Sequence, residues 1–185
     1  MLTFETLRRQ PHRFAELRGC DVLIGTADAR EVVIQPTAPA RGDPSPTLVF
    51  NHETIALMKA ERAGQIDKLK GVIHGDSVVI PLMKKPSSFW DHITVGRAST
   101  ADIVLEDPAV SNVHAHFVLH LDEHPVRIQD VGSSNGTFVN REPLQPHTAH
   151  PLVNGDCLRL GQTVLYLVTN SVLEQLLDQL GRGAR

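Results

Sequence analysis

The sequence has few cysteines, few aromatic residues and no long apolar run. Its two cysteines, Cys20 and Cys157, lie far apart and outside any CxxC pair, which excludes a disulfide framework and a cysteine-rich zinc site. No apolar run approaches the ~18 residues that a transmembrane helix needs. The N-terminus shows no basic stretch followed by a small-residue cleavage site, so we expect no secretory signal and a cytoplasmic protein.

An excess of charge of one sign is also missing. The formal net charge is −3 and no block of lysine and arginine stands out, which argues against nucleic acid or an anionic membrane surface as partner. The phosphate-cradling glycine motifs and the G-x-S-x-G nucleophile elbow are absent too. We therefore expect no catalytic residues, no cofactor and a protein that is not an enzyme.

The N-terminal part, residues 1–75, differs in pattern from the rest of the chain. Proline and glycine positions, helix caps and apolar spacing locate its elements. They predict a short helix at Pro11–Arg18, a strand at Glu31–Ile34, a proline-rich loop at Pro36–Pro46 and a second helix at Thr54–Ala63 that ends at Gly64. We predict an accessory mixed α/β segment of unassigned role.

From Ser77 onward, short extended segments alternate with turn residues, which is typical of an all-β sandwich. The predicted strands are 77–82, 92–95, 113–121, 126–131, 137–139, 158–160 and 164–168. In the third of these, Val113, Ala115, Phe117, Leu119 and Leu121 form an expected core face, and His114, His116, Val118 and His120 form a polar face.

Two further local patterns complete the prediction for this half. Asn135-Gly136 stands between two apolar strands and predicts a hairpin, because both residues tolerate positive φ. The end of the chain predicts a helix over 170–182 that packs on the sandwich. Its capping pair is Ser171 and Glu174, its apolar stripe recurs at helical spacing, and Gly181 is its expected stop.

Three short motifs occur in order in the β half: Gly96-Arg97, Ser111-x-x-His114 and Asn135-Gly136-Thr137. Together they resemble the forkhead-associated (FHA) family, and the resemblance covers residues 76–169. It implies a mainly β fold, namely an FHA-type β-sandwich of two antiparallel sheets, here with the accessory N-terminal segment and the short C-terminal helix. It also implies a module that binds phosphothreonine.

The resemblance assigns phosphopeptide-binding roles to Arg97, Ser111, Asn112, Ser134 and Asn135. A phosphate needs a cationic fork and hydroxyl or amide donors, which Arg97 and Ser111 supply. Asn135 is expected to hold the ligand's main chain, with Ser134 beside it. Many family members have arginine after the serine, so Asn112 makes this site less cationic and more dependent on Arg97.

Four neighbouring residues match positions that support the site in the family. These are Gly96, His114, Gly136 and Thr137. The chain's histidines also invite a metal hypothesis, but His116 and His120, on one face of a strand, are ~13 Å apart, too far to share an ion unaided. We predict no metal site.

The expected function is a phosphothreonine-dependent adaptor in Ser/Thr kinase signalling, whose partner is a phosphorylated protein such as a kinase or its substrate. An alternative is a phosphate-independent interaction or oligomerisation module that works through the N-terminal segment. A third possibility is that a phosphorylated Thr3 or Thr6 occupies the protein's own site. The sequence leaves the ligand's identity and the oligomeric state open.

Overall fold

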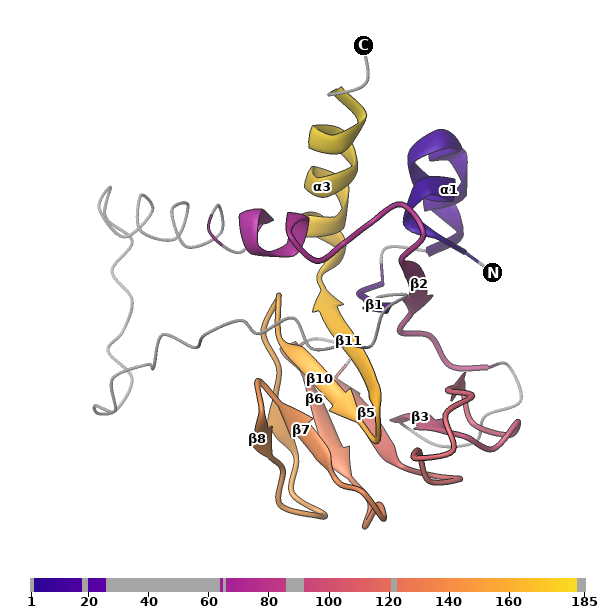
Figure 1. Cartoon of the computed structure of the whole chain (residues 1–185), viewed down its shortest axis with the longest axis vertical. Coiled ribbons are helices and arrows are strands. Elements are labelled where there is room, and N and C mark those ends of the chain that lie inside the picture. The colour runs from indigo at the N-terminus through magenta and orange to yellow at the C-terminus, as the bar shows by residue number, and fades with distance from the viewer. Residues whose placement is uncertain are drawn as a thin grey trace.

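The computed structural model describes residues 2–17, 20–25, 64, 66–85, 92–120 and 123–182 (Figure 1). The predictions for Glu31–Ile34, Pro36–Pro46 and Thr54–Ala63 lie outside these residues. The strands are β1 (Val22–Gly25), β2 (Val78–Pro81), β3 (His92–Gly96), β4 (Ile103–Val104), β5 (Ala115–His120), β6 (Glu123–Asp130), β7 (Thr137–Val139), β8 (Glu142–Pro143), β9 (His150–Pro151), β10 (Cys157–Leu160) and β11 (Thr163–Val168).

These strands form two sheets. The first has the order β2-β1-β11-β10-β7-β8, and the second has the order β4-β3-β5-β6-β9. The pairs are antiparallel except for the short parallel pair β3–β4, in which Val95 lies opposite Ile103. The prediction of a mainly β sandwich with a short C-terminal helix is confirmed.

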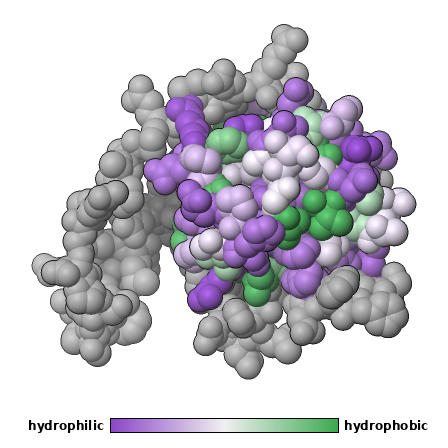
Figure 2. All heavy atoms as spheres, turned by 90° about the horizontal axis from the view of Figure 1, so that it is seen from below, coloured by the Kyte–Doolittle hydropathy of each residue, from purple (hydrophilic) through white to green (hydrophobic). Residues whose placement is uncertain are grey.

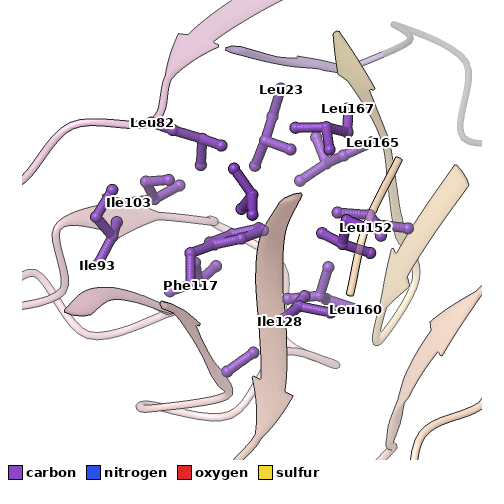
Figure 3. Packing of buried hydrophobic residues seen from close by; sticks show 14 of the residues in the cluster. Leu23, Leu82, Ile93, Ile103, Phe117, Ile128, Leu152, Leu160, Leu165 and Leu167 are labelled. Atoms are coloured by element: carbon purple, nitrogen blue, oxygen red, sulfur yellow. The ribbon is translucent and has the colours of Figure 1, made fainter. Parts of the chain in front are cut away.

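The main core lies between the sheets, where inward side chains of both meet (Figure 3). Phe117 of β5 and Leu23 of β1 are both fully buried there, as the period-2 alternation of strands requires. The predicted faces of 113–121 hold at Ala115 and Phe117. They are wrong before the strand begins, because Val113 is 47% exposed and the side chain of His114 turns inward and is fully buried.

A second core covers the outer face of the first sheet. It joins β1, β2 and β11 to α1 (Phe4–Arg9), to the 3-10 helix η1 (Pro11–Leu17), to the helical residues 66–70 and to α3 (Asn170–Arg182). In Figure 1 these helices lie above the strands. The segment expected to be accessory therefore contributes β1, between β2 and β11 of the first sheet, and a helical layer to the outer face of that sheet.

Several local predictions need correction. The helix α1 was not predicted, although Thr3 caps it by accepting a hydrogen bond from the N–H of Thr6. Gly64 is itself helical and does not end a helix, and α3 continues through Gly181 to Arg182. Asn135-Gly136 is not a hairpin turn, because β6 and β7 belong to different sheets and this segment crosses between them.

Candidate functional site

Three loops meet at the lower end of the sandwich in Figure 1: residues 97–102 after β3, 105–114 between β4 and β5, and 131–136 between β6 and β7. Seen from below in Figure 2, the described surface is largely hydrophilic, with a small hydrophobic area among the polar residues. Loops carried on a rigid sheet scaffold are the usual position for binding residues. Most of the predicted site residues lie on these loops.

Arg97 follows β3 directly and is held by the middle loop. Its backbone N–H donates to the carbonyl of Ser111 at 2.9 Å, and its side-chain Nε donates to the carbonyl of Val110 at 3.3 Å. The side chain is exposed. The guanidinium is therefore anchored through one nitrogen at the surface, close to Ser111.

Ser111 and Ser134 bring the second and third loops together. The N–H of Ser134 donates to Oγ of Ser111 at 3.0 Å, and the Ser111 hydroxyl donates to Oγ of Ser134 at 3.5 Å. The second bond is long, so the Ser111 proton can turn from Ser134 to a ligand while the oxygen keeps accepting from the Ser134 N–H. Asn135 next to it is exposed, and its amide donates to the carbonyl of Ala109 at 2.8 Å.

Asn112 is exposed, and its backbone explains why Gly96 is glycine. The carbonyl of Asn112 accepts a hydrogen bond from the N–H of Ala98 at 3.1 Å and crosses directly over Gly96. A Cβ at residue 96 would lie 2.1 Å from that carbonyl oxygen, closer than any real contact. Gly96 therefore permits the close approach of the two loops.

The buried ring of His114 supports the site from the inside. Its Nδ1 accepts the N–H of Ser111 at 3.0 Å, so the proton sits on Nε2, which donates to the carbonyl of Gly136 at 3.2 Å. Burial lowers the pKa of His114, although the Gly136 carbonyl and nearby carboxylates favour the charged form. The neutral ring thus links the loops of Ser111 and Gly136.

Asp130, which was not predicted from the sequence, organises the loop that carries Ser134 and Asn135. Its buried carboxylate accepts from the N–H groups of Gly132 and Ser133 and from the hydroxyls of Ser133 and Thr137, at 2.6–2.9 Å. Burial acts to raise the pKa of Asp130, but these hydrogen bonds outweigh it and the pKa is lowered. An Asp two residues before a turn glycine was the available signal.

Other candidate chemistry gives no site in the described part of the chain. His116 stacks on His92 with ring centroids 3.8 Å apart, and no group of three potential ligands is placed to hold a metal among the described residues. Burial raises the pKa of both Cys20 and Cys157, which disfavours the reactive thiolates. Within the same described ranges, no helix has the length and apolar character to cross a bilayer.

The sandwich and its loop cluster define a β-sandwich binding module, and comparison with known proteins agrees. Residues 93–161 match the FHA domain model. The glycogen accumulation regulator GarA of Mycolicibacterium smegmatis is 30% identical over 159 residues, which cover 80% of this chain and 90% of that protein. The chain belongs to the FHA domain family.

Two further relatives match shorter parts of the chain. The oxoglutarate dehydrogenase inhibitor of Corynebacterium glutamicum is 42% identical over 69 residues, which cover 37% of this chain and 45% of that protein. The solution structure of an FHA domain from Arabidopsis thaliana is similar with a TM-score of 0.41 at 33% identity, covering 51% of this chain and 75% of that one.

Proposed function

We propose that this protein is a phosphothreonine-dependent binding module in Ser/Thr kinase signalling, and that the loop cluster around residues 109–111 is its phosphopeptide site. The observation that carries the proposal is that Arg97, Ser134 and Asn135, from two other loops, all bond to residues 109–111, which include Ser111. The family membership gives the same function.

The donors of this cluster suit a phosphate ester. A phosphothreonine carries about −1.5 to −2 charges and three acceptor oxygens. The exposed guanidinium of Arg97 supplies charge-assisted bonds, which are roughly twice as strong as neutral ones. The Ser111 hydroxyl adds a neutral donor beside it, and the Asn112 amide is an exposed additional donor.

Asn135 has the geometry to hold the ligand's main chain. One N–H of its amide is used by the carbonyl of Ala109, which fixes the orientation of the side chain. Its carbonyl oxygen and second N–H can then pair with a peptide group of the ligand. Ser134 precedes Asn135 in the chain, bonds to Ser111 and serves as an extra contact.

The partner we propose is a phosphorylated protein, such as a kinase or a kinase substrate. The names of two relatives describe regulation, of glycogen accumulation and of oxoglutarate dehydrogenase. We therefore propose an adaptor that regulates by binding rather than an enzyme. The same proposal keeps residues 76–169 as the part that carries the FHA motifs, with β1 of the N-terminal segment completing its first sheet.

The experiment that tests the proposal compares Arg97→Ala with wild type. A peptide is first selected from a degenerate phosphothreonine library and its Kd is measured by fluorescence anisotropy. Removing the guanidinium should cost about 2–5 kcal/mol, or ~30-fold or more in affinity. Arg127→Ala, which removes an exposed arginine from β6, serves as the control and should stay within about twofold.

The proposal fails if Arg97→Ala binds as tightly as wild type, or if the unmodified threonine peptide binds as tightly as the phosphorylated one. A pull-down before and after phosphatase treatment distinguishes the proposal from the phosphate-independent alternative. Only the alternative predicts that the partner is still captured after the treatment. Occupation of the site by Thr3 or Thr6 has no support in the geometry: their hydroxyls bond one another at 2.8 Å where α1 begins.

A further inference from the structure

The strip of residues 109–111 holds the proposed ligand groups together. The carbonyl of Ala109 orients the Asn135 amide, and the carbonyl of Val110 accepts from Nε of Arg97. The carbonyl of Ser111 accepts the backbone N–H of Arg97. A displacement of this strip would therefore move the guanidinium, the hydroxyl and the amide away from a common point.

Asp107 fixes this strip from its N-terminal side. Its Oδ1 accepts the N–H of Ala109 at 2.8 Å, and its backbone carbonyl accepts the N–H of Val110 at 2.9 Å. Its Oδ2 accepts the N–H of Gln162 at 3.0 Å and the hydroxyl of Thr163 at 2.9 Å. One carboxylate thus connects the strip to the turn between β10 and β11.

The same turn also packs tightly against the strip. Gly161 has φ +59°, and a Cβ added there would lie 2.6 Å from the carbonyl carbon and oxygen of Ala109. Thr163 begins β11 of the first sheet, whereas Asp107 lies 56 residues away in sequence, in the loop between β4 and β5 of the second sheet. The contact therefore fixes the site loop of one sheet to a turn of the other.

The charge of Asp107 has to be reconciled with an anionic ligand. A carboxylate facing a phosphate would repel it. Here both carboxylate oxygens are occupied by donors of its own loop and of the β10–β11 turn. Asp107 therefore faces the turn, which is the orientation of a positioning residue and not of a ligand contact.

We propose that Asp107, together with Thr163 and the turn at Gly161, positions the phosphopeptide-binding groups by fixing residues 109–111. This inference rests on the proposed function. The inference predicts that the affinity for the phosphopeptide depends on residues that do not contact the phosphopeptide.

The test measures the Kd of a library-selected phosphothreonine peptide for Asp107→Ala, Thr163→Val and Thr163→Ser, with thermal unfolding of each. We expect about tenfold weaker binding for Asp107→Ala and about threefold for Thr163→Val, because each loses hydrogen bonds of ordinary strength. Thr163→Ser keeps the hydroxyl and should bind like wild type. Asp67→Ala, which removes an exposed carboxylate paired with Lys70, should also bind like wild type.

A double-mutant cycle separates positioning from general destabilisation. If Asp107 acts through Arg97, the effect of Asp107→Ala should shrink in an Arg97→Ala background. Wild-type affinity in both Asp107→Ala and Thr163→Val overturns the inference, and so does an effect of Asp107→Ala that is undiminished in the Arg97→Ala, Ser111→Ala and Asn135→Ala backgrounds. Should Asp107→Ala not fold, the comparison of Thr163→Val with Thr163→Ser decides.

Failure of the proposed function gives a different result. In that case wild type selects no phosphothreonine peptide. Amide hydrogen exchange of the free protein then tests whether Asp107 and Thr163 fix residues 109–111. Faster exchange at Ser134 and Arg97 in Thr163→Val than in Thr163→Ser supports it, because both amides donate to Ser111. Equal exchange rates overturn it.

Discussion

Gly96 is a residue whose role depends on the absence of a side chain. A methyl group there would meet the Asn112 carbonyl at 2.1 Å, so Gly96→Ala must push the site loop away from β3. We expect a loss of about 1–3 kcal/mol in the free energy of unfolding, measured in urea, and a loss of peptide binding. Gly64→Ala should be neutral or slightly stabilising, because an added Cβ would have no atom of the described residues outside its own helix within 4 Å. Normal stability in Gly96→Ala would contradict the close approach.

His114 gives the site a dependence on pH. Its folded pKa is lowered by burial, whereas in the unfolded chain it is ordinary, about 6.5. The unfolded state therefore binds the proton more readily, and stability present above pH ~6.5 is lost as the pH falls towards the folded pKa. Protonated Nδ1 would also face the N–H of Ser111, one donor against another.

The measurement is the free energy of unfolding between about pH 7.5 and 5, where carboxylates with ordinary pKa values of ~4 stay charged. Wild type should lose stability over this range. His114→Gln should be less stable at pH 7.5 and have a flatter profile, whereas His150→Gln, at an exposed position, should keep the wild-type slope. An unchanged slope in His114→Gln would assign the dependence to another group.

Among single residues, the sequence indicated the proposed ligand groups and the supporting residues Gly96 and His114, but not Asp107. Arg97, Ser111 and Asn135 were predicted from short motifs through their resemblance to the FHA family, and the structure brings them together. Asp107 was missed because its partners, Gln162 and Thr163, lie 55 and 56 residues away. Only the fold shows which loop such a carboxylate fixes.

Among the elements, β1 has a larger role than its four residues suggest. It lies between β2 and β11, with Leu23 in the main core and Val22 and Ile24 in the second core. Leu23→Ala should therefore cost about 2–5 kcal/mol in the free energy of unfolding, because it leaves a cavity between the sheets. Val153→Ala, at a side chain that is 59% exposed, should change it by less than about 0.5 kcal/mol. A small effect of Leu23→Ala would mean that the stability of the sandwich does not depend on β1.

The strands of the β half were predicted because alternation and turn residues are local signals. Strand pairing is not local: β1 was not predicted at all, and it pairs with β11 through Val22 and Val168. The same reason explains the error at Asn135-Gly136, whose turn chemistry is read correctly but whose flanking strands enter different sheets.

For the whole molecule, the two cores make the N-terminal part and the sandwich one folding unit. A fragment of residues 76–185 keeps the FHA motifs but lacks β1, α1 and η1. It would leave β2 and β11 without their common neighbour and uncover apolar side chains that β1 and the helices bury, among them Val79, Tyr166 and Val168. We expect this fragment to unfold without a sharp thermal transition and to bind the phosphothreonine peptide far more weakly than the full chain.

A fragment of residues 1–75 supplied in trans should restore part of the binding if the missing strand is the cause. A fragment that melts as cooperatively as the full chain, and binds as well, would show that the N-terminal segment is accessory after all.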